Sequence, residues 1–144
     1  MIQSTPGDVE DYLAAYGWNF RRHGRGVWIS GWSSDERSFP LRVTWSESFI
    51  DLMVQPLYKL EFDWEAYPEV ATWLLELGHQ YSMIKITIDE IGDLVMSLSL
   101  VNHNLDAISF STSLGIIGHY ADRVYGEIAD ALDQLSSDFE IPII

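Results

Sequence analysis

The stretch MIKITIDEIGDLVMSLSLV, residues 83–101, decides the fold class because it has the pattern of two strands joined by a short turn. Residues 83–88 and 94–101 are the predicted strands. The turn between them contains Gly92, which can adopt the positive φ that a hairpin turn needs. We therefore expect a β-hairpin in this part of the chain.

Three more strands are predicted upstream of the hairpin. Residues 27–32 and 39–45 alternate between two faces, as half-buried strands do, and polar residues 33–38 form a turn between them. Residues 49–60 form the third of these strands. Pro56 interrupts it, which indicates either an edge position or a bulge, because proline cannot donate a hydrogen bond to a neighbouring strand.

Two helices are predicted before the hairpin. Thr5 is a good N-cap, Pro6 suits the first helical position, and Gly17 ends the first helix. Residues 64–77 form the second helix, and Gly78 is its expected C-terminal cap.

A third helix is predicted over residues 114–135, where apolar residues repeat at alternating spacings of three and four. Glycines beside this repeat each weaken a helix by roughly 1 kcal/mol, so they indicate close packing against the chain's own sheet or a second subunit. The tail, residues 136–144, is expected to be irregular. The candidate packing or dimer seam consists of Gly115, Gly118, Ala121 and Val124.

The predicted element order is α-β-β-β-α-β-β-α, an α+β fold with an antiparallel sheet packed against helices. The chain has 144 residues, which is within the usual range for one domain. It contains no internal repeat, linker or low-complexity tract. We therefore expect a single domain over residues 1–144, with a core from about residue 6 to residue 135.

Composition excludes several classes of function. The chain has no cysteine, so it has no disulfide or thiolate chemistry, which suits a reducing cytoplasm. The net charge of −14, from 22 acids and 8 bases, makes nucleic acid and membrane surfaces poor partners. Residues 1–8 lack the features of a signal peptide, and no apolar run is long enough for a membrane span. We expect a soluble cytoplasmic protein.

No catalytic or metal-binding motif is present, so we expect no catalytic residue, metal or cofactor. His119 and Asp122 share a helical face but are too few to hold a metal, and a simple surface contact is the favoured reading. Residues 89–93 lack the donor spacing of a calcium loop. The basic residues from Arg21 to Arg25 are either an anion contact or, as we favour, a solvated loop.

The tryptophans provide the candidate partner-binding residues, Trp28, Trp32 and Trp45. Trp28 and Trp32 lie on one face of the same predicted strand. If that face is open, it is a docking surface, because tryptophan is enriched at binding hot spots. The alternative, which is slightly favoured, is that helices cover the face and the tryptophans belong to the core.

Several pieces of this sequence resemble the YbjN-like family of bacterial sensory transduction regulators, which is similar in fold to the class I type III secretion chaperones. They are the helix ending Trp73-Leu74-Leu75-Glu76-Leu77 before the strand at residue 83, the hairpin at residues 88–95, and the pair Ala121-Asp122 in the last helix. The resemblance covers about residues 8–135. Family members commonly carry asparagine after the second helix, where this chain has Gly78-His79.

The resemblance implies protein–protein interaction, often as a homodimer, and no enzymatic activity. Our first hypothesis is therefore a non-catalytic adaptor or chaperone-like regulator that binds a polypeptide through a sheet face or a strand edge. The alternative is a small-ligand sensor with an aromatic-lined pocket between helix and sheet.

Overall fold

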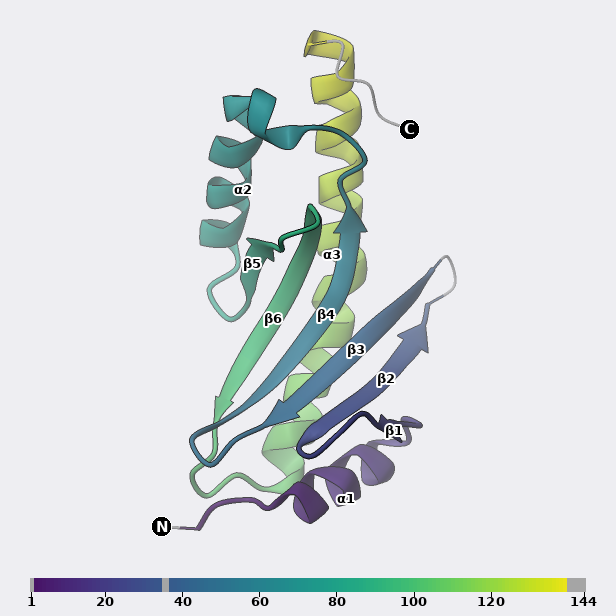
Figure 1. Ribbon diagram of the computed structural model, residues 1–144, viewed down its shortest axis with the longest axis vertical. Coiled ribbons are helices and arrows are strands. Elements are labelled where there is room, and N and C mark those ends of the chain that lie inside the picture. The colour runs from purple at the N-terminus through teal and green to yellow at the C-terminus, as the bar shows by residue number, and fades with distance from the viewer. Residues whose placement is uncertain (1, 35–36, 140–144) are drawn as a thin grey trace.

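The computed structural model describes residues 2–34 and 37–139 of the chain. Within these residues, three α-helices and six strands follow one another (Figure 1). The elements are α1 (Pro6–Tyr16), β1 (Arg21–Arg22), β2 (Val27–Ser33), β3 (Ser38–Trp45), β4 (Phe49–Lys59), the 3-10 helix η1 (Trp64–Ala66), α2 (Pro68–Gln80), β5 (Lys85–Ile88), β6 (Asp93–Val101) and α3 (Ala107–Phe139).

The strands form one antiparallel sheet in the order β1-β2-β3-β4-β6-β5, so the predicted fold class is confirmed. The hairpin between β5 and β6 is also confirmed, with Gly92 at a φ of 88°. Sequence patterns did not predict β1, because a strand of two residues is too short to show a periodicity. The helix predicted over residues 64–77 is divided into the 3-10 helix η1 and α2, which begins at Pro68.

The helices cover one face of the sheet and leave the other open. In Figure 1, α3 runs behind the strands, while α1 lies at one end of α3 and α2 lies beside β5. Strand residues on the covered face pair with one another across the sheet, as Trp28 does with Val43 and Leu52 with Leu98. These residues form one hydrophobic core with the buried residues of the helices. We call the uncovered side of the sheet the open face.

Helix α1 begins and ends as its sequence predicts. The Thr5 hydroxyl accepts a hydrogen bond from the Asp8 N–H at 3.1 Å, and the Asp8 carboxylate accepts one from the Thr5 N–H at 2.8 Å. This reciprocal pair satisfies two donors that the helix itself leaves unpaired. Gly17 ends the helix in the left-handed conformation, at a φ of 91°.

The expected ends of the other two helices are wrong. Gly78 lies inside α2, whose C-cap is Tyr81. Helix α2 continues past the glycine because Tyr81 is buried and its hydroxyl donates a hydrogen bond to Glu127 of α3 at 2.6 Å. Helix α3 begins earlier than expected, since the Asp106 carboxylate accepts a hydrogen bond from the Ser109 N–H and acts as a cap. It also extends to Phe139, into the tail expected to be irregular.

The buried stripe of α3 departs from the predicted repeat towards its end. Leu114, Ile117, Ala121, Val124 and Ile128 are fully buried. The predicted spacing places the next apolar residue three positions later, at Ala131, but the next buried residue is Leu132. A straight helix has 3.6 residues per turn, so a spacing of alternating threes and fours drifts off its face over a long helix. No helix among the described residues is both long and apolar enough to cross a bilayer.

Pro56 lies in a central strand, so the bulge is the correct one of the two expected alternatives. Strand β4 pairs with β3 on one side and β6 on the other. The pairing with β6 shifts register between Val54 and Tyr58. A bulge at this point removes the need for a backbone donor at the proline.

Candidate functional site

Trp28 is a core residue. It is only 2% exposed, and its indole N–H donates a hydrogen bond to Glu10 of α1 at 2.8 Å. The same carboxylate also accepts two hydrogen bonds from Arg22, at 2.6 and 2.8 Å. The hydrogen bond from Arg22, followed by that from Trp28, lowers the pKa of Glu10 from 4.5 to about 2. This cluster attaches α1 to the sheet.

Trp32 and Trp45 are half-buried and have structural contacts of their own. Trp32 stacks on Trp18 with ring centroids 5.0 Å apart and an interplanar angle of 4°. The Trp45 indole N–H donates to the Ser4 carbonyl at 2.7 Å. Trp28 and Trp32 thus lie on the face that the helices cover, as the slightly favoured alternative expected. A partner-binding role for these three residues stays a prediction.

The candidate seam on α3 divides into two parts. Ala121 and Val124 are fully buried and belong to the core between α3 and the sheet. A Cβ at Gly115 would lie 3.7 Å from the Tyr16 hydroxyl, whereas one at Gly118 would meet nothing within 4 Å. Packing within the chain therefore accounts for Ala121 and Val124 and places Gly115 beside α1, but it does not account for Gly118. Dimerisation through Gly118 stays a prediction.

The two other candidates from the sequence are the His119–Asp122 pair and the basic cluster from Arg21 to Arg25. The Asp122 carboxylate accepts a hydrogen bond from the Ser34 hydroxyl at 3.1 Å and lies 3.6 Å from Arg37, while His119 is exposed. Among the described residues, no group of three His, Cys, Asp or Glu side chains could hold a metal ion. In the basic cluster, Arg22 is paired with Glu10, and Arg21 and Arg25 are exposed.

The Asp89 carboxylate stabilises the turn of the β5–β6 hairpin. It accepts hydrogen bonds from the backbone N–H groups of Ile91 at 3.0 Å and Asp93 at 2.9 Å. The bond from Asp93 is the main cause of the lowered pKa of Asp89. A carboxylate that faces the amides of its own turn fits the predicted hairpin and not a calcium loop.

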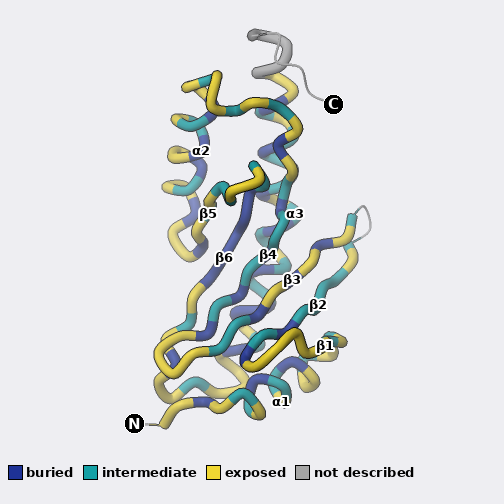
Figure 2. The backbone as a smooth tube through the Cα atoms, in the orientation of Figure 1, coloured by how far each residue is buried: buried dark blue, intermediate teal, exposed yellow. Residues whose placement is uncertain are grey.

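An apolar groove lies between α2 and β5. We call it the α2–β5 groove, and its volume is about 350 Å³. Leu75 of α2 is 78% exposed there, and exposed positions along α2 and β5 are visible in Figure 2. Leu75 lies outside the buried stripe of α2, a signal in the sequence that could have pointed to this groove. The groove is lined by Trp64, Ala71, Leu74, Leu75, Ile86, Thr87, Ile88 and Leu94.

The groove borders a free strand edge. Strand β5 is the last strand of the sheet and pairs only with β6 within the described part of the chain. Its outer edge therefore carries backbone donors and acceptors that no described strand uses. Ile86 and Ile88 of β5 point into the groove, so the apolar lining and the free edge belong to the same strand.

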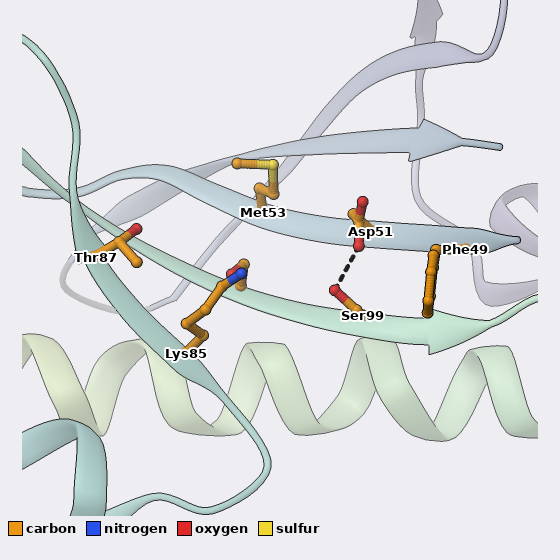
Figure 3. Close-up of a pocket in the computed structure, with 7 residues that line it drawn as sticks. Phe49, Asp51, Met53, Lys85, Thr87 and Ser99 are labelled. Atoms are coloured by element: carbon orange, nitrogen blue, oxygen red, sulfur yellow. Dashed lines mark hydrogen bonds between the residues drawn. The ribbon is translucent and has the colours of Figure 1, made fainter.

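A second hollow, of about 450 Å³, lies on the open face across β4, β6 and β5. We call it the open-face trough (Figure 3). Phe49 lies towards one end and Thr87 towards the other, and the Ser99 hydroxyl donates a hydrogen bond to Asp51 between them. Strand β5 separates the trough from the α2–β5 groove, and Thr87 contributes to both. The trough is lined by Phe49, Asp51, Met53, Lys85, Thr87, Ser97 and Ser99.

Proteins of known structure that share this fold include a secretion chaperone and a regulator. The type III secretion chaperone SycH from Yersinia pestis, in complex with a stable fragment of YscM2, has 11% identity and a TM-score of 0.52, covering 83% of this chain and 98% of that chain. YbjN from E. coli, described as "a putative transcription regulator", has 13% identity and a TM-score of 0.58, covering 98% and 97%. At these identities the likeness shows the fold alone.

Sequence comparison identifies the family. No curated protein matches the sequence. The model of the YbjN family, described as "Putative bacterial sensory transduction regulator", matches residues 5–130. The match includes every element from α1 to β6 and most of α3. The chain therefore belongs to the YbjN family.

Proposed function

We propose that the protein is a non-catalytic, cytoplasmic regulator or adaptor that binds an extended polypeptide along the free edge of β5. The observation that carries the proposal is the apolar groove beside that edge. A peptide that adds to β5 as a further strand would satisfy the unused backbone groups of the edge. Its alternate side chains would enter the α2–β5 groove beside Leu75, Ile86 and Ile88.

The family and the fold support this kind of function. The family is described as "Putative bacterial sensory transduction regulator", and the chaperone SycH, which has the same fold, was crystallised with a fragment of another protein. The geometry of the groove adds a reason specific to this chain. Leu75 is a large aliphatic side chain left 78% exposed beside a strand edge, where it costs solubility unless a partner covers it.

The small-ligand sensor has less support. It requires aromatic side chains that line a pocket between helix and sheet. Instead, aromatic side chains in that layer contact one another: Trp18 stacks on Trp32, and Tyr58 lies 4.9 Å from Tyr125. The α2–β5 groove contains one tryptophan, Trp64, and no tyrosine.

A selection from a random peptide library tests the proposal without a known partner. Peptides selected on the wild-type protein should have apolar residues at every second position, because only alternate side chains face the groove. Their binding should slow hydrogen exchange at residues 85–88. The variant Leu75→Glu should not bind these peptides, since a charge in the groove has no counter-charge among the lining residues.

Ile91→Glu is the matched control. Ile91 is 82% exposed at the turn of the β5–β6 hairpin and does not line the groove. The control should bind the selected peptides as the wild type does. Peptides that bind Leu75→Glu equally well, or that protect a region other than β5, would contradict strand addition at this edge.

A further inference from the structure

Charge is distributed very unevenly between the strands and the rest of the chain. The strands contain two of the 22 acids, Asp51 and Asp93. They contain five of the eight bases, which are Arg21, Arg22, Arg42, Lys59 and Lys85. The sheet therefore carries most of the positive charge of a chain whose net charge is −14.

The register of the strands places four of these five bases on the open face. Residues directly opposite each other in an antiparallel pair point to the same side of the sheet. Arg22 is opposite the buried Trp28 and so faces α1, while its neighbour Arg21 faces the other way. The other three open-face bases are identified by their partners: Arg42 is opposite Met53, Lys59 opposite Asp93, and Lys85 opposite Ser97.

Apolar side chains lie among these charges. Phe49 and Val101 are opposite each other on the open face and are 48% and 64% exposed. Phe49 and Met53 line the open-face trough together with Lys85. Arg42 is next to the trough, because it is directly opposite Met53. The open face thus combines a hollow, exposed apolar groups and bases on two sides of the hollow.

We propose that the open face is a docking surface for an acidic polypeptide segment, which places carboxylates at Arg42 and Lys85 and apolar side chains against Phe49 and Met53. Charge complementarity carries the inference. The rest of the protein is strongly acidic and repels such a segment, so the open face is the surface on which it can be received. The site goes beyond strand addition at β5 and does not depend on it.

The carboxylate of Asp51 in the trough favours a polypeptide over a nucleic acid as the ligand. Asp51 lies between Phe49 and Met53 and accepts a hydrogen bond from Ser99. A phosphate backbone carries a charge at every unit and would bring one of them against this carboxylate. A polypeptide can place a hydroxyl or apolar side chain there and still present carboxylates to the bases on either side.

The test measures fluorescence anisotropy of a labelled synthetic peptide in which glutamate alternates with valine and serine. We expect the wild type to bind it, and we expect Arg42→Glu and Lys85→Glu each to weaken binding by roughly tenfold. Both side chains are exposed, so circular dichroism should show an unchanged fold. Amide chemical shifts should change at residues around the trough.

Arg25→Glu is the matched control, because it makes the same change of charge at an exposed base outside the strands. It should bind the peptide as the wild type does. The proposal is overturned if the wild type does not bind, if Arg25→Glu weakens binding equally, or if a single-stranded oligonucleotide binds better than the peptide.

Two further measurements distinguish this proposal from binding at the β5 edge and from a second copy of the chain on the open face. If Leu75→Glu abolishes binding and Lys85→Glu does not, the peptide occupies the β5 edge, and the open-face proposal fails while strand addition stands. If sedimentation shows that Arg42→Glu converts a dimer into a monomer, the face is covered by a second copy, which also overturns the proposal.

Discussion

At the scale of single residues, Glu10 makes acid stability predictable. Its folded-state pKa is about 2, well below its ordinary value of 4.5. The unfolded chain therefore binds a proton more readily than the folded one over this interval, and folding stability falls as pH falls through it. The contribution of the Glu10 charge is fully present above pH 4.5 and is lost as the pH approaches 2.

We therefore predict that Glu10→Gln destabilises the protein near neutral pH, and that its difference from the wild type shrinks as pH falls from 4.5 towards 2. Urea unfolding followed by tryptophan fluorescence over a pH series measures it. Asp11→Asn is the control, because Asp11 is exposed on the same helix and its carboxylate makes no hydrogen bond or ion pair with the described residues. A difference that stays constant with pH would show that the charge of Glu10 is not the cause.

Asn102 gives a second prediction at this scale. It is 2% exposed, and its amide accepts a hydrogen bond from the Ser4 N–H at 2.7 Å and donates to the carbonyls of Ser4 and Ser46, both at 3.1 Å. Asn102→Ala leaves the buried Ser4 N–H without its acceptor, while the Ser4 carbonyl keeps the hydrogen bond from the Trp45 indole, so the free energy of unfolding should fall by about 1–3 kcal/mol. Asn19→Ala, which removes an exposed amide and leaves the Asn19 carbonyl that accepts from Ser30, should cost much less in the same denaturation experiment. Equal losses would contradict this account.

At the scale of elements, a substitution at Gly118 tests whether the glycines of α3 are needed for close packing. A Cβ at this position meets nothing within 4 Å, so Gly118→Ala adds a better helix former without a clash. It should raise the free energy of unfolding by about 0.5–1 kcal/mol. Gly31→Ala in β2 should do the opposite, because its Cβ would lie 2.8 Å from the Phe39 carbonyl oxygen. If Gly118→Ala instead lowers the free energy of unfolding, and this loss grows with protein concentration, the glycine lies in a dimer interface.

The elements of this fold were predicted from the sequence more fully than the contacts between them. The hydrophobic periodicity and the capping residues predicted the sheet, the hairpin and the start of α1, because each of these depends on residues close together in the chain. The position of Trp28 was left open, since its burial depends on Glu10 in α1 and Val43 in β3. The α2–β5 groove was missed for a similar reason. Its lining brings together η1, α2, β5 and β6, and no local pattern reports that arrangement.

At the scale of the whole molecule, the surplus of acids should govern how stability responds to salt. The net charge is −14, and four of the eight bases lie on the open face instead of beside the acids of the helices. Repulsion among the remaining acids favours the expanded, unfolded chain, and salt screens it within a Debye length of about 10 Å at 0.1 M. Adding salt should therefore stabilise the folded protein.

Two variants at one position, one that reverses the charge and one that removes it, separate this effect from general salt effects on proteins. Glu76 of α2 is exposed. We predict that Glu76→Lys raises the melting temperature at low salt by up to roughly 3 °C, and Glu76→Gln by about half as much, because the gain follows the change in charge. Both gains should disappear in calorimetry at about 1 M NaCl, where the Debye length is about 3 Å. Gains that persist at high salt would come from helix propensity, whereas a melting temperature that falls as salt is added would mean that attractive ion pairs outweigh the repulsion.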